Sequence, residues 1–199
     1  MLALDVSPCR ATVAWGEQRR LITVVREDRE MAMSEPAGTE QLATSQAEGG
    51  TASAAALRKV HAARGRRALD RAAAACRYAG VEEHDAQAVP RDPAAKAANA
   101  LRLSAQVLAE LDHSPLDPAA DARCARNAAA AAAIAAQVAR DHGGATEPSA
   151  AAYRAALKAS QAAMQAAGSE GMGRNEGLNA DADAAEADAS LAARAAGWI

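Results

Sequence analysis

The chain has 199 residues and a net charge of −3, and 62 of its residues are alanine. Leu, Val and Ile supply only 26 residues and Phe is absent, which places the large aliphatic side chains below the ~20% at which disorder becomes a concern. The small net charge argues against disorder, because disordered chains combine low hydrophobicity with high net charge. No run of about 18 apolar residues predicts a membrane span, and the first residues lack the basic and apolar segments of a signal peptide. We therefore expect a soluble, cytoplasmic protein.

Alanine is the best helix former, but its methyl group buries little apolar area. We expect helices that form readily and a weakly stabilised core, which close helix packing or self-association would strengthen. The 19 Arg against 3 Lys indicate a source genome of high GC content. Cys9, Cys76 and Cys124 lie far apart without a C-x-x-C motif, so the sequence indicates neither a zinc site nor a redox pair. We expect Cys76 and Cys124 to be small buried apolar residues.

Residues 1–51 are predicted to form an N-terminal extension. Two β-branched runs within residues 11–26 flank a Gly-Glu-Gln segment, which is typical of a β-hairpin. Alternatively, translation begins at Met31 or Met33, and residues 1–30 belong to an over-extended gene model. Residues 34–51 carry no hydrophobic period and are predicted to be a polar linker.

Four helices are predicted within residues 52–168 from alanine-rich sequence with apolar residues at helical spacing. In the first helix His61 shares a side with Leu57 and Cys76, which is more typical of a core histidine than of a ligand. In the third, Asn127 lies among alanines on the apolar side, where it sets the helix register or faces a partner helix. Short connections favour antiparallel neighbours, so we expect an all-α, antiparallel (up-down) four-helix bundle. The predicted helices are 52–79, 93–112, 118–142 and 148–167.

The helix ends carry recognisable capping residues. The Asp-Pro pairs at 92–93 and 117–118 place an N-cap acceptor directly before a proline, which has no N–H to leave unpaired. Before the fourth helix, Thr146 is a better N-cap than Glu147. Gly80 is predicted as the residue that follows the C-cap of the first helix.

The C-terminal region, residues 169–199, is predicted to begin with a Gly-rich flexible linker. The segment after it is rich in alanine and carries several Asp and Glu residues, which predicts an acidic helix over about 180–197. We expect this helix to be mobile, and its docking is not determined by the pattern. The predicted units are therefore an extension (1–51), a helical bundle (52–168) and this C-terminal region.

Charge is unevenly distributed along the chain. Residues 51–80 carry seven basic residues and one acid, a net +6, whereas residues 81–118 and 168–199 each carry −4. A basic helix can bind phosphates or an acidic partner, or it can pair with the acidic segments of its own chain. Nucleic-acid binding has little support, because no aromatic residue is interleaved for base stacking. The candidate anion- or partner-binding residues are Arg58, Lys59, Arg66, Arg67 and Arg71.

Catalytic patterns are sparse in this sequence. Glu110 and His113 have the E-x-x-H spacing that carboxylate-bridged metal bundles use, but only one such motif is present. No nucleophile elbow or phosphate-binding loop occurs. We predict a non-enzymatic protein without a cofactor that binds a protein partner or itself. An anion- or nucleic-acid-binding module that uses the helix around residues 57–77 and a metal-dependent helical bundle are the alternatives.

Overall fold

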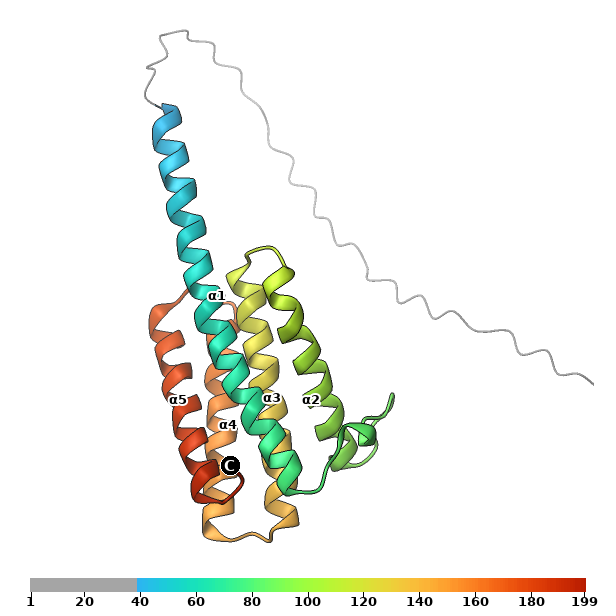
Figure 1. The fold of residues 1–199 in the computed structure, drawn as a ribbon. Helices are drawn as coiled ribbons and strands as arrows, with labels where there is room; N and C mark the ends of the chain where they lie inside the picture. Colours follow the sequence, from blue (N-terminus) through green and yellow to red (C-terminus); the bar gives the residue numbers. More distant parts are fainter. Residues whose placement is uncertain (1–38) are drawn as a thin grey trace, which may run out of the picture. The chain divides into compact units, whose positions relative to one another are not determined.

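The computed structural model describes residues 39–199, with side chains from residue 53 onward. This part of the chain contains five α-helices, two short 3-10 helices and no strand, which confirms the all-α prediction for these residues. The predicted hairpin over residues 11–26 lies outside the described residues. The elements are α1 (Thr39–Tyr78), η1 (Glu83–Asp85), α2 (Pro93–Glu110), η2 (Leu111–His113), α3 (Pro118–His142), α4 (Glu147–Ala167) and α5 (Glu176–Ala195) (Figure 1).

Three helices begin at the predicted capping residues. The side chain of Asp92 accepts a hydrogen bond from the backbone N–H of Ala95 at 2.8 Å. Asp117 accepts from two N–H groups in the first turn of α3, at 3.0 and 3.2 Å. Thr146, rather than the glutamate after it, caps α4 through the N–H of Ser149 at 3.3 Å. Each cap satisfies a donor that the helix start would otherwise leave unpaired.

Helices α1 and α5 end in the same way, at glycines with positive φ. Gly80 has φ +68° and Gly197 has φ +72°, a conformation that costs glycine nothing. The N–H of the next residue turns back to a carbonyl of the helix, at 2.9 Å for Val81 and 3.0 Å for Trp198. Trp198 is only 6% exposed, and its ring centroid lies 6.3 Å from that of Tyr78. The end of α5 is thereby joined to the end of α1.

Two segments differ from the sequence prediction. Helix α1 begins at Thr39 instead of residue 52, so most of the predicted linker 34–51 is helical. The predicted acidic helix is present as α5, but it packs against α4 and α1 where a mobile helix was expected. Its buried residues recur at helical spacing on one side of the helix. They are Asn179, Ala182, Ala185, Glu186, Ala189 and Ala193.

Small side chains determine how the helices pack. Helix α3 contacts α1, α2 and α4, and α5 lies against α4 and α1 (Figure 1). Of the 34 buried hydrophobic residues from residue 53 onward, 29 are alanine, so the helices meet through methyl groups. At Gly65 even a methyl group would lie 2.8 Å from Leu108 Cδ2 and 3.4 Å from the Ala125 Cα atom. None of the helices described here is both long enough and apolar enough to cross a membrane.

Candidate functional site

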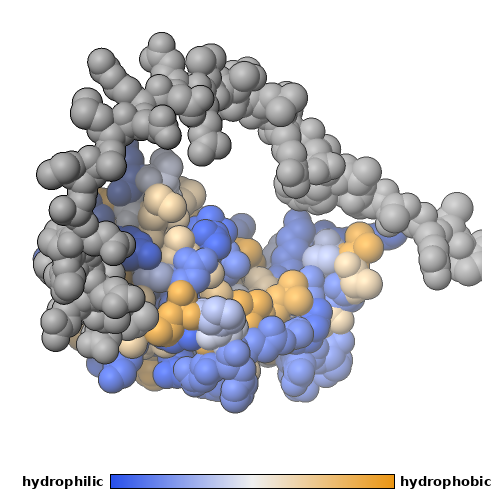
Figure 2. Space-filling view, turned by 90° about the horizontal axis from the view of Figure 1, so that it is seen from above, coloured by the Kyte–Doolittle hydropathy of each residue, from blue (hydrophilic) through white to orange (hydrophobic). Residues whose placement is uncertain are grey.

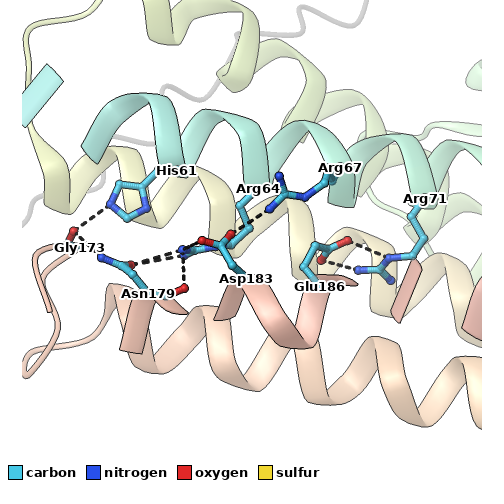
Figure 3. A network of polar contacts seen from close by, with 8 residues as sticks. All are labelled: His61, Arg64, Arg67, Arg71, Gly173, Asn179, Asp183 and Glu186. Atoms are coloured by element: carbon cyan, nitrogen blue, oxygen red, sulfur yellow. Dashed lines mark hydrogen bonds and ion pairs between the residues drawn. The ribbon is translucent and has the colours of Figure 1, made fainter. Parts of the chain in front are cut away.

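Polar side chains gather between α1 and α5 (Figure 3). Because a helix turns every 3.6 residues, α1 positions spaced by three and four residues share one side. Three polar positions on α5, spaced by four and then three residues, oppose them. We call this set the α1–α5 polar seam. It consists of His61, Arg64, Arg67, Arg71, Asn179, Asp183 and Glu186.

The most deeply buried ion pair of the seam joins Arg71 to Glu186. Arg71 Nε donates to Oε1 at 3.0 Å and Nη2 donates to Oε2 at 2.7 Å. The two side chains are 3% and 1% exposed. Arg71 Nη1 is also buried and has no hydrogen-bond partner among the described residues. A buried pair of this kind contributes little net stability, but removing one partner is costly because the other charge stays buried.

Asp183 is shared by two arginines. Arg64 Nε donates to Oδ1 at 3.0 Å and its Nη2 donates to Oδ2 at 3.2 Å. Arg67 Nη2 donates to the same Oδ1 at 2.9 Å. Arg64 Nη2 also donates to the backbone carbonyl of Asn179 at 2.9 Å. One carboxylate is therefore shared by two guanidinium groups, and the carbonyl accepts from one of the remaining donors.

His61 is fully buried, as its position among apolar residues predicted. It lies 2.9 Å from the carbonyl oxygen of Gly173 through Nε2. That oxygen can only accept, so Nε2 carries the proton and donates it, and Nδ1 is the unprotonated nitrogen. Nδ1 has no hydrogen-bond partner in the described part of the chain. Burial lowers the pKa of His61, and the nearby charge of Arg64 lowers it further.

A second buried pair connects α1 to α3. Arg58 donates through Nε and Nη2 to the two carboxylate oxygens of Asp121, each at 3.0 Å. Its Nη1 donates to the carbonyl of Ser114 at 2.7 Å, and Nη2 also contacts the carbonyl of Pro115. Asp121 is 1% exposed, and its hydrogen bonds raise the pKa of Arg58. Arg58 thereby fixes the α2–α3 connection to α1.

Four of the five residues predicted to bind an anion form ion pairs with carboxylates of the same chain. The pair not yet described joins Arg66 Nη2 to Asp112 Oδ2 at 3.2 Å, and its side chains are 55% and 65% exposed. Lys59 is exposed. The basic face of α1 therefore directs most of its charge toward α3 and α5. The four are Arg58, Arg66, Arg67 and Arg71.

Sequence reasoning missed Arg64 and all of its partners on α5. A signal was present, because Asn179, Asp183 and Glu186 recur at the spacing of one helix face. The sequence predicts only a mobile acidic helix over about 180–197, since one sequence does not show which face meets another helix. Asp121 was missed for the same reason.

The predicted metal-binding residues lie apart from the seam. Glu110 ends α2 and His113 lies in η2, and both are exposed. Within residues 53–199 no group of three or more His, Cys, Asp or Glu side chains is placed to hold a metal ion. Burial raises the pKa of Cys76 to about 11 and also raises that of Cys124. Both cysteines are held as thiols at neutral pH.

Two of the grooves on the described part of the chain bear on its function. One, of about 650 Å³, runs between α1 and α5 beside the polar seam. The other, of about 270 Å³, lies between α2 and α3, where Leu103 and Val107 are 45% and 38% exposed. At the end of the helices shown in Figure 2, hydrophobic and hydrophilic residues are intermixed.

No protein-family model, curated protein or solved structure matches this chain. Its function is therefore inferred from the contacts and surfaces described above.

Proposed function

We propose that this chain is a non-enzymatic helical interaction protein that associates with a second copy of itself through α2 and α3. The observation that carries the proposal is the apolar groove between these helices. Leu103 and Val107 of α2 and Ile134 of α3 form its walls, and Leu103 and Val107 are exposed. Nothing in the described part of the chain covers them.

Small residues line the rest of this groove. Ala100 lies on α2 and Ala130 and Ala131 lie on α3. Methyl side chains let another helix axis approach closely, which suits a partner that is itself rich in alanine. A two-fold symmetric dimer would bring the groove of one copy against the groove of the other.

Asn127 supports the same face. It is exposed at the groove, and its side-chain oxygen accepts from Arg126 at 3.3 and 3.1 Å. The side-chain amide nitrogen is a donor that a partner helix could use. One of the two roles expected for this residue was contact with a partner helix, and its place in the groove favours that role.

Burial of apolar side chains would favour association. Burying the exposed half of a Leu or Val side chain contributes about 1 kcal/mol. Two copies would bury four such side chains, or about 4 kcal/mol, before the alanines and aliphatic stems are counted. A stable dimer buries about 1,600 Å² in total, so the face must extend beyond the groove along both helices. Each buried alanine contributes less stabilising free energy than a larger core residue would. The apolar area buried in a dimer would add to this small contribution.

The proposal includes the finer topology expected from the sequence. We propose that α1 to α4 form an antiparallel up-down four-helix bundle, to which α5 adds a further helix. The four residues between α3 and α4 support this topology, because so short a connection favours antiparallel neighbours.

Light scattering after size exclusion, at low and high salt, tests the association. We expect a species of twice the monomer mass at both salts, because the groove is apolar and screening acts on charges. Leu103→Glu with Val107→Glu is expected to give a monomer with unchanged helix content by circular dichroism. Leu157→Glu on α4 is the matched control, because Leu157 is 38% exposed and lies away from the groove. A wild-type monomer at all concentrations, or equal dissociation by the control, would refute self-association through this face.

A further inference from the structure

A second surface, on α1 and α5, combines positive charge with an apolar wall. The groove of about 650 Å³ beside the polar seam is lined by four arginines and one acid, Asp70. Leu191 and Ile199 form part of its apolar wall and are 61% and 54% exposed. The volume falls within the range of about 300–1,000 Å³ that small-molecule sites occupy. The arginines are Arg67, Arg71, Arg77 and Arg194.

Positive charge is in excess around this groove. The four lining arginines and Arg64 carry +5, three side-chain carboxylates carry −3 and the terminal carboxylate of Ile199 carries −1, which leaves +1. Asp183 is divided between Arg64 and Arg67. Arg77 and Arg194 are exposed at the groove. The side-chain carboxylates are Asp70, Asp183 and Glu186.

One buried donor at this groove also lacks an acceptor. Arg71 lines the groove and is 3% exposed, and Glu186 occupies only its Nε and Nη2. Its Nη1 has no partner among the described residues. A buried polar atom without a partner is costly, but this nitrogen is closed even to water, so an anion in the groove does not reach it. The donors that the groove offers to an anion are therefore those of Arg77 and Arg194, which line it and are exposed.

We propose that the α1–α5 groove binds a small organic anion with an apolar chain, of the medium-chain carboxylate class. The head group is placed among the arginines, where it accepts from the exposed Arg77 and Arg194 and neutralises the excess charge. The chain lies along Leu191 and Ile199. A simple anion would leave this apolar wall uncovered, and an uncharged chain would leave the exposed arginines without a counter-charge. The site uses a different face from the α2–α3 groove and does not depend on self-association.

Calorimetric titration of the full chain with octanoate tests the proposal, with acetate and 1-octanol as probes that carry only the charge or only the chain. A ligand of the size of octanoate, with ten heavy atoms, is expected to bind with a Kd of about 1 mM. Acetate and octanol are each expected to bind at least about tenfold more weakly, because each lacks half of the recognition. Equal binding of acetate, or no octanoate binding at several times 1 mM, would overturn the proposal.

Variants at the groove's exposed residues separate binding from folding. Arg77→Gln with Arg194→Gln removes two exposed charges, and we expect octanoate to bind about tenfold more weakly. Leu191→Asn is expected to weaken octanoate binding without affecting acetate. Arg123→Gln, an exposed arginine on α3, is the matched control and should bind like wild type. Equal weakening by the control would show a general charge effect and refute the site. Leu103→Glu with Val107→Glu should leave octanoate binding intact, which separates this inference from the self-association test.

Discussion

Removal of Glu186 should test whether the buried seam holds α5 in place. Glu186 is 1% exposed and is the ion-pair partner of Arg71, which is 3% exposed. Glu186→Ala leaves a buried guanidinium without its carboxylate, and such losses cost about 3–5 kcal/mol. A domain of this size has a total stability of about 5–15 kcal/mol, so the variant loses a large fraction of it.

The assay is urea denaturation followed by circular dichroism. With a slope of about 2 kcal/mol per M, a loss of about 4 kcal/mol lowers the midpoint by about 2 M. Replacing both partners, Arg71→Met with Glu186→Leu, should recover most of that loss, because no unpaired charge remains.

A matched surface pair provides the control. Arg66 and Asp112 are 55% and 65% exposed, so Arg66→Ala should cost no more than about 1 kcal/mol. If Glu186→Ala and Arg66→Ala shift the midpoint equally, or if the double replacement is as unstable as Glu186→Ala, the argument from buried charge is refuted.

Three further predictions concern single residues. Burial lowers the pKa of His61, so as pH falls the unfolded chain takes up a proton first, near its ordinary pKa of about 6.5. The contribution of His61 to stability is therefore full above about pH 6.5 and declines as the pH falls toward the lower pKa of the folded state. The unfolding temperature should fall less from pH 7.5 to 5.5 in His61→Gln than in the wild type. An equal fall in both proteins would count against a buried, neutral His61. Gly173 has φ +70°, and a Cβ there would collide with the Pro118 carbonyl, whereas Gly80 has φ +68° with nothing within 4 Å. Gly173→Ala should therefore cost more than the roughly 1–2 kcal/mol expected for Gly80→Ala, and equal losses in chemical denaturation would contradict that geometry. Burial raises the pKa of Cys76 to about 11, so its thiol should resist iodoacetamide in the native protein and react only in denaturant. Peptide mass spectrometry can measure this labelling. Rapid labelling of the native protein would contradict the burial of Cys76.

The sequence predicted the helices well where the chain carries local signals. The Asp-Pro pairs, Thr146 and Gly80 act within one turn of the helix they cap, so their effect is visible in a single sequence. The start of α1 was misjudged because Ser, Thr and Gly have weak helix propensity, and propensity was the only guide there.

The candidate sites could not be predicted to the same degree. Arg71 was identified as part of a basic face, but its partner Glu186 is 115 residues away in the sequence. Helical periodicity shows which residues share a face, whereas the pairing of two faces depends on tertiary packing. The α2–α3 groove was equally difficult to predict, because Leu103 has the same residue type as the buried Leu108, and only the packing of the neighbouring helices distinguishes them.

The alanine core also constrains how this chain can vary. An ordinary core of leucine and isoleucine accommodates a new side chain by changing rotamers. A methyl group has no χ angle, so a larger residue at Ala125 or Ala132, both fully buried, can be admitted only if whole helices separate. Tolerated replacements at the helix crossings are therefore expected to be confined to Gly, Ser and Cys. Over evolution, substitutions should change the side-chain volume of the interior only slowly, even where surface residues are replaced freely.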